Sequence, residues 1–420
     1  MYLKDDGASA LLFWLLVARL SPRACGHETP SQESQRTPAN LSTPSAFLNN
    51  SYLAFNLYKQ MVAKHPDQNF MFSPLSLSIP LTLLAFQAPP EIRTEVLEGL
   101  GWGAAQVPED RVHEHYSELL LSWLPPPGQC HLDTGSMLFL DKNIHLIRKF
   151  ANIAQSLYHT KASLIPFNNY KAAQEMMDSF IRKKTQGNIE KLAQTTGPNV
   201  VLILANYMLI TVEWKYRFNP KFTKMEAFHL KENFLIPVFM MQRLGWFQVH
   251  RLNHLHSDLL RLPFSCNITA VFILPDLGLL KQVEEALMKE DLNTWTQPIP
   301  PSRRRLFMPK FSLSWRMQLD QLLPELGIWK IFRHFYSLSG VAAQTMPMRV
   351  SKAVQVAMLT VDEKGAEEED ITDFQFLPKA FLPHLRMDKP FLFLIFEENS
   401  RSLLLMGKVI NPSINLEPVD

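Results

Sequence analysis

The feature that most restricts the fold is the segment 200–212, which reads Val-Val-Leu-Ile-Leu-Ala-Asn-Tyr-Met-Leu-Ile-Thr-Val. Side chains of a strand alternate between the two faces of its sheet, so a strand that is apolar on both faces has to be covered on both. The segment therefore predicts a central strand with a layer packed on each side.

Weaker patterns fill in the other elements. Strand-like runs recur at 269–274, 305–313, 353–360, 391–396 and 403–409. Apolar residues at helical spacing predict helices at 47–63, 109–124, 146–158, 171–185, 280–289 and 316–326. Helices early in the chain and strands late, with no internal repeat, indicate the α+β class.

One helix has a marked start. Phe72 ends a short strand, Ser73 is a good N-cap, and Pro74 suits the first helical position because its missing N–H costs nothing there. Pro80, deeper in the same helix, lacks an N–H for the backbone ladder, so we expect a kink that costs about 3 kcal/mol.

The N-terminus has the pattern of an export signal. Lys4 precedes an apolar run at 8–18, and Ala24-Cys25-Gly26 offers small residues for cleavage. We predict a signal peptide at 1–26, a flexible tail at 27–45 that is rich in Thr, Ser, Pro and Gln, and one domain at 46–420. Sequons at Asn40, Asn49 and Asn267 agree with a secreted, extracellular glycoprotein.

Charge and motifs argue against several classes. The formal net charge of +2 gives no signature of nucleic-acid binding, and no later apolar stretch is long enough to span a membrane. No G-x-S-x-G, H-E-x-x-H, C-x-x-C or phosphate-loop pattern occurs, so we expect no catalytic residue, metal or cofactor. The basic cluster Arg303-Arg304-Arg305 leaves a glycosaminoglycan partner open, although a solvated face explains it more simply.

Cys130 and Cys266 would remain after removal of the signal. We interpret them as unpaired thiols, with one long-range bridge as the alternative, because sequence alone cannot place them within bonding distance.

An ordered series of short segments, from about Phe47 to Pro412, resembles the serpin family, and most closely its antitrypsin-like secreted branch. The segments include, in chain order, Phe72-Ser73-Pro74-Leu75-Ser76, Leu97-Glu98-Gly99-Leu100-Gly101, Lys184-Thr185-Gln186-Gly187, Asn206-Tyr207 with Trp214, Asn267-Ile268-Thr269, Pro309-Lys310-Phe311, Val350-Ser351-Lys352-Ala353, Val361-Asp362-Glu363-Lys364-Gly365, Asp388-Lys389-Pro390-Phe391 and Met406-Gly407-Lys408-Val409-Ile410-Asn411-Pro412.

The resemblance implies a single domain with three β-sheets, eight to nine helices and an exposed reactive-centre loop at about 365–386. It also implies a mechanism. A serine protease attacks the loop and forms an acyl-enzyme, and the cut loop then inserts into the main sheet faster than the acyl-enzyme is hydrolysed. The same resemblance assigns Ser73, Ser76, Asn206 and Trp214 to the shutter and breach, which control sheet opening.

Aligned with an antitrypsin-like loop, the scissile bond falls at Lys379-Ala380, next to Pro378. A lysine at the specificity position suits a trypsin-like protease, whose primary pocket is acidic. A partner of this kind, as substrate or target, is therefore expected.

The hinge departs from the family pattern. Inhibitors of the family have Thr or Ser after the hinge glycine and then small residues, whereas here Gly365 is followed by Ala366-Glu367-Glu368-Glu369-Asp370-Ile371-Thr372. On insertion Ala366, Glu368, Asp370 and Thr372 would turn into the core. The predicted hinge also includes Glu363, before the glycine, and Glu369, which lies between two of the inward residues. Burying Glu368 and Asp370 requires their protonation, which at pH 7 costs roughly 8 kcal/mol for the two carboxyls. If about 3 kcal/mol of this cost adds to the activation barrier of insertion, insertion becomes about 100-fold slower.

A second departure is Gln355, which stands where the family has a shutter His. Its amide can still donate to and accept from Asn206, Ser73 or Ser76. We therefore predict a monomeric serpin that is non-inhibitory or a poor inhibitor, with a binding, carrier or cleavable-loop role. A small hydrophobic ligand would fit the carrier role. The alternative is a suicide-substrate inhibitor of a trypsin-like protease, cleaved at Lys379-Ala380.

Overall fold

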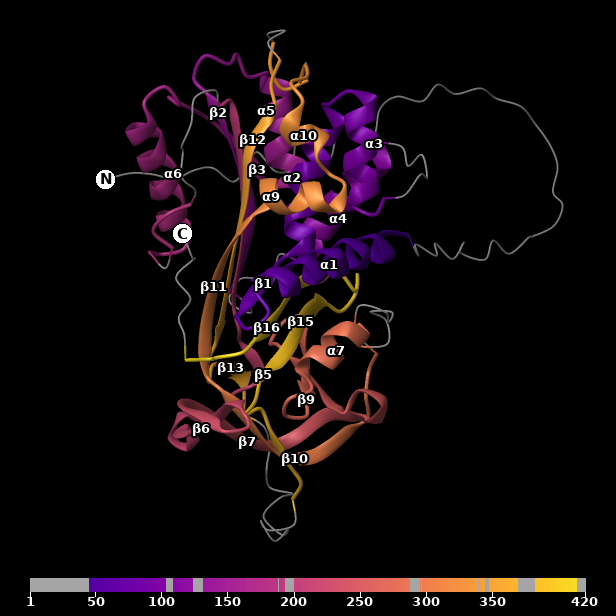
Figure 1. The fold of residues 1–420 in the computed structure, drawn as a ribbon, viewed down its shortest axis with the longest axis vertical. Helices are drawn as coiled ribbons and strands as arrows, with labels where there is room; N and C mark the ends of the chain where they lie inside the picture. Colours follow the sequence, from indigo (N-terminus) through magenta and orange to yellow (C-terminus); the bar gives the residue numbers. More distant parts are fainter. Residues whose placement is uncertain are drawn as a thin grey trace, which may run out of the picture. The chain divides into compact units, whose positions relative to one another are not determined.

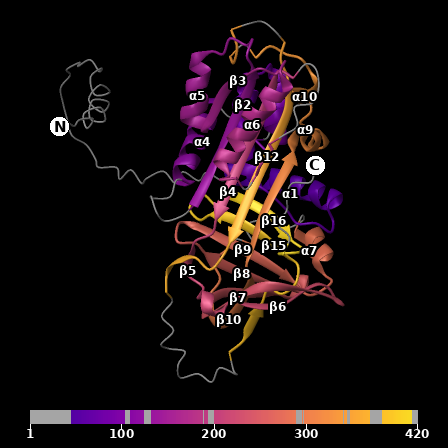
Figure 2. The same cartoon turned by 90° about the vertical axis from the view of Figure 1, so that its left-hand side faces the viewer.

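The segment that predicts a doubly covered strand forms β4 (Leu202–Thr211), the centre of a five-stranded sheet in the computed structural model (Figure 2). Its neighbours follow the order β11-β12-β4-β2-β3. The bounds of the other four strands are β2 (His131–Asp141), β3 (Thr160–Ile165), β11 (Phe311–Gln318) and β12 (Val350–Val361). The structure describes residues 45–102, 109–123, 131–187, 189–192, 200–287, 295, 297–338, 340–343, 347–368 and 382–413, within the compact unit 44–420.

Both faces of β4 are covered, as predicted. Ile203, Ala205 and Tyr207 belong to a buried cluster with residues of helix α6 (Tyr170–Lys184), which lies over one face of the sheet. Leu204 belongs to the main core on the other face. The alternation of a strand divides these apolar residues between two cores.

A second, nine-stranded sheet makes up most of the other half of this unit (Figure 1). Its order is β1-β16-β15-β9-β8-β7-β10-β14, and β6 pairs with β7 off this path. The strands are β1 (Phe70–Phe72), β6 (Lys224–Lys231), β7 (Phe234–Leu252), β8 (Ser257–Pro263), β9 (Ile268–Pro275), β10 (Pro301–Pro309), β14 (His384–Arg386), β15 (Phe391–Glu397) and β16 (Leu403–Val409). A third sheet holds only β5 (Trp214–Tyr216) and β13 (Gly365–Glu367).

Most helices surround the five-stranded sheet (Figure 1). Besides α6 they are α1 (Ser45–Lys64), α2 (Pro74–Phe86), α3 (Pro90–Gly99), α4 (Glu109–Trp123), α5 (Arg148–Tyr158), α7 (Leu280–Leu287), α9 (Leu319–Leu322) and α10 (Lys330–Arg333). Three sheets and nine helices among the described residues confirm the expected α+β fold.

Two element predictions were wrong in detail. The run 305–313 is split between β10 and β11, which belong to different sheets and meet at Lys310. The helix expected at 316–326 begins only at Leu319, because the buried positions of β11 alternate as far as Met317, with the period of a strand.

The interpretation of Cys266 as an unpaired thiol is also wrong, because Cys266 is disulfide-bonded. The other two cysteines of the chain, Cys25 and Cys130, lie outside the described residues. Separation along the sequence carries no information on the distance between two thiols, which is why the pattern could not reveal the bond.

Candidate functional site

In the five-stranded sheet, which we take as the main sheet of the predicted mechanism, β4 and β12 are directly paired and parallel. Their register places Gln355 opposite Asn206 and Thr360 opposite Thr211. The main sheet is therefore closed, and an incoming strand would have to separate these two strands along most of their length (Figure 2).

A buried hydrogen-bond cluster ties the closed strands to the start of α2. Gln355 Nε2 donates to Asn206 Oδ1 and to Ser73 O, both at 2.8 Å, and Gln355 Oε1 accepts from Ser73 N at 2.8 Å. Ser76 Oγ donates to Asn206 Oδ1 at 2.8 Å. Gln355 thus makes the contacts that its amide chemistry allows, and they join β12 to β4 and to α2.

Pro80 is part of the same arrangement. Helix α2 continues through Pro80, which has no N–H to donate to the carbonyl of Ser76 one turn earlier. That carbonyl instead accepts from Asn206 Nδ2 at 2.8 Å, while the side chain of Ser73 caps the helix through Ser76 N. The backbone bond that Pro80 removes from the helix is therefore replaced by a bond to the central strand.

Trp214 closes the end of the sheet nearest the hinge. Its indole is buried, packs edge-on against Phe218 and Phe264, and donates from Nε1 to Asp362 O at 2.9 Å. Its backbone N donates to Lys364 O at 3.0 Å. Both bonds reach the segment that leads from β12 into the loop.

Glu363 anchors this segment through its side chain. Its carboxylate accepts from Lys310 Nζ at 2.7 Å and from Thr223 Oγ1 at 2.8 Å. Partial burial alone would raise the pKa of Glu363, but the hydrogen bonds from Lys310 and Thr223 outweigh it and lower the pKa.

The hinge itself pairs outside the main sheet. Gly365 lies opposite Trp214 and Glu367 opposite Tyr216 in the β13–β5 pair. Arg217 N donates to Glu367 O at 2.9 Å. A Cβ on Gly365 would come within 2.6 Å of Arg217 N and 2.7 Å of Trp214 O, so only glycine allows this approach.

Ala366, Glu367 and Glu368 are exposed. The carboxylate of Glu368 forms an ion pair with the guanidinium of Arg217. The first of the two carboxylates predicted to oppose insertion is thus in solvent, beside a cation.

Between the Gln355–Asn206 contact and the hinge, the core-facing side of β4 and β12 is apolar. On the core-facing side, Met208 lies opposite Ala357 and Ile210 opposite Leu359, and each is at most 3% exposed. None of these four side chains can donate a hydrogen bond to a carboxylate.

Several predicted residues cannot be placed. Six loop and hinge residues, Pro378, Lys379, Ala380, Glu369, Asp370 and Thr372, lie outside the described residues, as does the sequon at Asn40. Asn49 is in α1, and only the backbone of this residue is described. Asn267 is exposed, and its amide nitrogen, the atom that a glycan would join, donates to Glu397.

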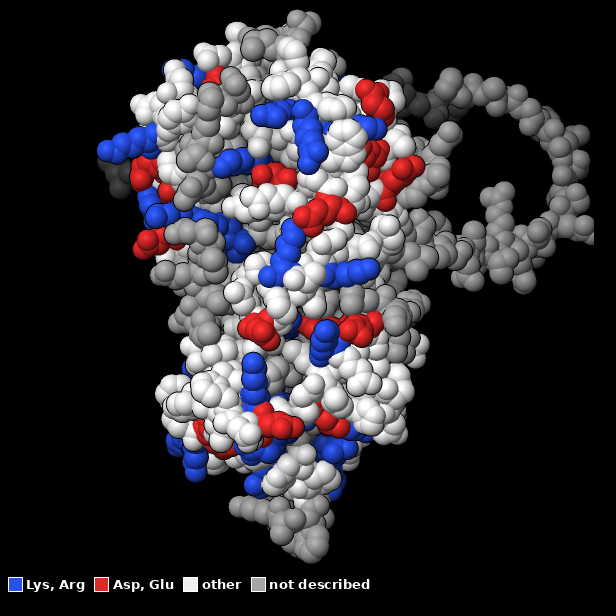
Figure 3. Space-filling model, in the orientation of Figure 1, with Lys and Arg blue, Asp and Glu red and all other residues white. Residues whose placement is uncertain are grey.

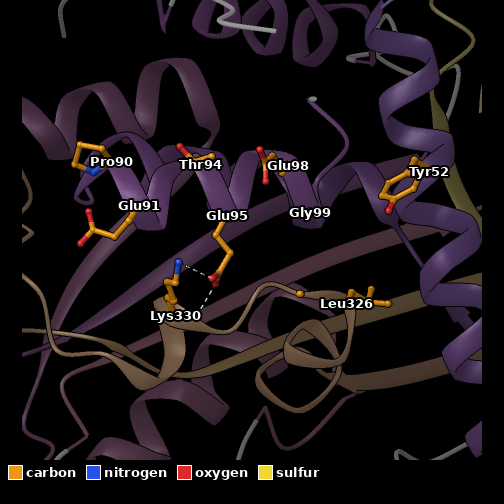
Figure 4. A pocket seen from close by; sticks show the side chains of 10 residues that line it. Tyr52, Pro90, Glu91, Thr94, Glu95, Glu98, Gly99, Leu326 and Lys330 are labelled. Carbon is orange, nitrogen blue, oxygen red and sulfur yellow. Dashed lines mark hydrogen bonds and ion pairs between the residues drawn. The ribbon is translucent and has the colours of Figure 1, made fainter. Parts of the chain in front are cut away.

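A cavity of about 630 Å³ opens between α3 and α10, away from the hinge (Figure 4). Its lining includes Glu91, Glu95 and Glu98. Glu95 points toward Lys330, pairs with its Nζ at 3.5 Å and accepts from the backbone N of Trp329 at 2.7 Å. That carboxylate holds α10 in place, which gives it a structural role.

A larger cavity of about 1200 Å³ lies at the end of α1. Apolar residues such as Val62, Leu277 and Leu280 line it. Its charged residues are of both signs: Asp67, Lys231, Glu232, Asp276, Lys281, Glu284 and Lys389. Within the described residues no group of three or more His, Cys, Asp or Glu side chains is arranged to hold a metal ion. No described helix is both long and apolar enough to cross a membrane.

Sequence reasoning missed the cations that hold the hinge. Lys310 was seen only as part of a family segment, and Arg217 gave no signal, because its partner Glu368 is distant in the sequence. Lys310 directly follows β10, and Arg217 directly follows β5. An excess of acids at 363–370 was the one available hint that cations would lie nearby.

Comparisons with known proteins agree with this geometry. Residues 48–412 match the profile of the family Serpin (serine protease inhibitor). The chain is 33% identical to alpha-1-antitrypsin-like protein GS55-MS of Ictidomys tridecemlineatus, over 93% of this chain and 92% of that protein. It is 35% identical to serpin A3-6 of Bos taurus, over 98% and 100%. A solved structure of thyroxine-binding globulin in complex with thyroxine superposes with a TM-score of 0.80 at 30% identity, covering 88% of this chain and 99% of that one.

Proposed function

Since this chain belongs to the serpin family, we propose that it is a secreted, monomeric glycoprotein that does not trap proteases. It is neither an enzyme nor an efficient inhibitor. A trypsin-like protease cuts its loop after Lys379, and the cut loop stays outside the main sheet, so the protease is released. The observation that carries the proposal is the acidic hinge, whose Glu368 is solvated and paired with Arg217.

The cost of insertion supports this outcome. Glu368 would leave water and the Arg217 cation for an interior of Met208, Ile210 and Leu359. Protonating one carboxyl at pH 7 costs roughly 4 kcal/mol, and Asp370 adds about the same at the next inward position. If even part of this cost raises the activation barrier of insertion, insertion slows and hydrolysis of the acyl-enzyme is favoured.

Contacts that have to break before the hinge can insert add to the activation barrier of insertion. To enter the sheet, the hinge has to lose the β13–β5 pairing, and the segment behind it is held by Trp214 and Glu363. The β4–β12 pairing and the Gln355–Asn206 bond have to break as well.

The direct test mixes the full chain with trypsin at equimolar ratio and examines the products on a denaturing gel. We expect one cleavage after Lys379 and no band at the summed mass of the two proteins. An SDS-stable complex formed by the unmodified chain would show that it is an inhibitor, which is the alternative function.

A pair of variants separates the hinge charges from other causes. Glu368→Ala combined with Asp370→Ala removes both inward carboxylates, and we expect covalent complex with trypsin to form. The matched control, Glu367→Ala with Glu369→Ala, removes two acids that would face the other way, and it should leave the chain a substrate. If the two double variants behaved alike, it would not matter which face of the inserted strand carries the acids, and the proposed cost of burying Glu368 and Asp370 would be refuted.

A carrier role is a second candidate, favoured by the cavity of about 1200 Å³ at the end of α1. Its apolar lining residues suit a small hydrophobic ligand. This role needs no loop insertion, so it is compatible with the acidic hinge.

A further inference from the structure

The charged side chains on the face shown in Figure 3 are interspersed, with Lys and Arg beside Asp and Glu. Exposed ion pairs of this kind contribute little each to the stability of a fold. A covalent bond between distant segments restricts a chain far more, and Cys266 takes part in a disulfide. The partner of Cys266 decides which parts of the fold this bond ties together.

Within the chain, two cysteines are available as partners for Cys266, namely Cys25 and Cys130. Cys25 lies in the predicted signal peptide at 1–26, which a secreted protein loses. Cys130 directly precedes His131, the first residue of β2. The described neighbours of Cys130 therefore indicate whether it can reach Cys266.

The start of β2 lies beside the end of β4. His131 is opposite Thr211 in the antiparallel pair that these strands form. Continuing this register by one residue brings Cys130 beside Val212, with about 5 Å between the two Cα atoms. Cys130 is thus expected next to the segment that links β4 to β5.

The turn that carries Cys266 lies against the same segment. This turn joins β8 to β9, and Ser265 N within it donates to Glu213 O at 2.7 Å. Cys266 directly follows Ser265. Val212, which Cys130 is expected to lie beside, directly precedes Glu213. The two cysteines are thereby brought close to the Cα separation of about 4.4–6.8 Å that a disulfide requires.

Both halves of the five-stranded sheet are attached to the nine-stranded sheet at this end (Figure 2). On one side, β12 pairs with β11, which follows β10 directly after Lys310. On the other side, Trp214 of β5, the strand after β4, is opposite Phe264 of the β8–β9 turn. A bond from Cys130 to Cys266 would add a covalent link between β2 and the same turn.

From these observations we infer that Cys130 and Cys266 form a disulfide that holds the five-stranded sheet closed between β4 and β12 at the end near the hinge. Admitting a strand there moves β4 and β12 apart by about 4.8 Å, one strand spacing. The bond cannot lengthen by that amount, because its two Cα atoms stay within about 6.8 Å of each other. Opening therefore has to displace the β8–β9 turn while the bond is intact. This inference does not rest on the acidic hinge.

Reduction removes the restraint. One thiolate of a dithiol such as dithiothreitol attacks a sulfur of the bond, which forms a mixed disulfide and releases the other cysteine as a thiolate. The second thiol of the reductant then displaces the remaining cysteine. Two electrons pass from the dithiol, which becomes a cyclic disulfide, to the two cysteines, and each cysteine takes up a proton. Cys266 is only partly buried, so a small reductant has access to it.

Peptide mapping by mass spectrometry tests the pairing. The full chain is digested without reductant after its free thiols have been blocked. We expect one cross-linked product that joins the peptides of Cys130 and Cys266. A bond from Cys266 to Cys25 or to a second chain, or a blocked free thiol at Cys130, would overturn the inference.

Hydrogen exchange tests the effect on the sheet. Val212 N donates to Thr360 O at 2.9 Å, so this amide joins the end of β4 to β12 and exchanges when the two strands separate. We expect dithiothreitol to speed exchange at Val212 at least about tenfold. The labelling time is kept short enough that the amides of β15 and β16 stay protected, which shows that the fold is retained.

The matched control is the double variant Cys130→Ser with Cys266→Ser. Its Val212 amide should exchange as fast as that of the reduced natural chain, and dithiothreitol should not change it further. Unchanged exchange at Val212 after complete reduction of the natural chain would overturn the inference. Equal acceleration by the reductant in the double variant would overturn it as well, because the reductant would then act elsewhere.

Discussion

Among single residues, Glu363 has the most defined environment in the hinge region. Lys310 and Thr223 bind its carboxylate and lower its pKa, so the folded protein favours the charged form. A group whose pKa is lowered by folding stabilises the protein above its ordinary pKa, and this contribution disappears as the pH falls through the folded value.

We therefore predict a pH-dependent effect of Glu363→Gln. At pH 7 the variant should be less stable than the natural chain by about 1 kcal/mol, and this difference should shrink as the pH falls below the ordinary glutamate pKa of 4.5. Urea midpoints of both proteins from pH 7 to pH 3 measure this. A difference that stays constant with pH would mean that the carboxylate charge is not what anchors the segment.

A second residue-scale feature is the buried pair Lys408 and Glu284. Lys408 Nζ donates to Glu284 Oε1 at 3.0 Å and to Pro66 O at 2.8 Å, and Tyr58 OH donates to the same carboxylate oxygen at 3.0 Å. Burial, and then the adjacent carboxylate, raise the pKa of Tyr58 well above its ordinary value, so the phenol stays a donor.

Removing the acid alone should therefore be costly. Glu284→Val leaves a buried, uncompensated ammonium, and we expect a loss of about 3–5 kcal/mol in unfolding free energy. Adding Lys408→Met to this variant should recover much of the loss, because the charge is then gone. Chemical denaturation of the three proteins tests this, and failure of the second change to restore stability would contradict the electrostatic explanation.

At the scale of elements, α2 and β4 are coupled through Pro80. The proline leaves the Ser76 carbonyl without its helical donor, and Asn206 supplies the missing bond. The sequence predicted a kink and its cost, but it could not show that a strand residue distant in the chain satisfies the carbonyl.

A double-mutant cycle should reveal this coupling. Asn206→Ala is expected to destabilise the natural chain more than it destabilises Pro80→Ala, since the backbone N–H restored by the second substitution can donate to the Ser76 carbonyl. We expect a coupling of about 1 kcal/mol from the unfolding free energies of the four proteins. Additive effects would mean that Pro80 and Asn206 act independently.

The elements also show where sequence reasoning works. Long periodic segments such as α1, α4, α6 and β4 were predicted close to their observed bounds, because burial on one or two faces dictates the pattern. The break between β10 and β11 was missed, because apolar residues continue on both sides of Lys310, and only the pairing partners distinguish the two strands.

The residues of the candidate site also fall into two groups, those that the sequence singled out and those that it did not. The family resemblance, which rests on local motifs and their order along the chain, singled out Gly365, Glu368, Gln355 and Trp214 as candidates. Their partners, above all Arg217, come from elements that are remote in sequence, and nothing local encodes those contacts. The disulfide of Cys266 belongs to this second group.

At the scale of the whole molecule, the proposed function depends on two features. The five-stranded sheet is closed between β4 and β12, and the hinge that follows β12 carries acidic side chains. In the described residues β4 and β12 pair directly, and the hinge pairs with β5 instead. If insertion is prevented, cleavage leaves this arrangement and its stability nearly unchanged. If insertion occurs, the five-stranded sheet gains a fully paired strand and becomes far more stable.

The melting temperature of the chain before and after trypsin cuts the loop distinguishes these outcomes most directly. We predict a change of a few degrees at most for the natural chain, and a rise of tens of degrees for Glu368→Ala with Asp370→Ala. A comparably large rise in the natural chain would show that its acidic hinge enters the sheet.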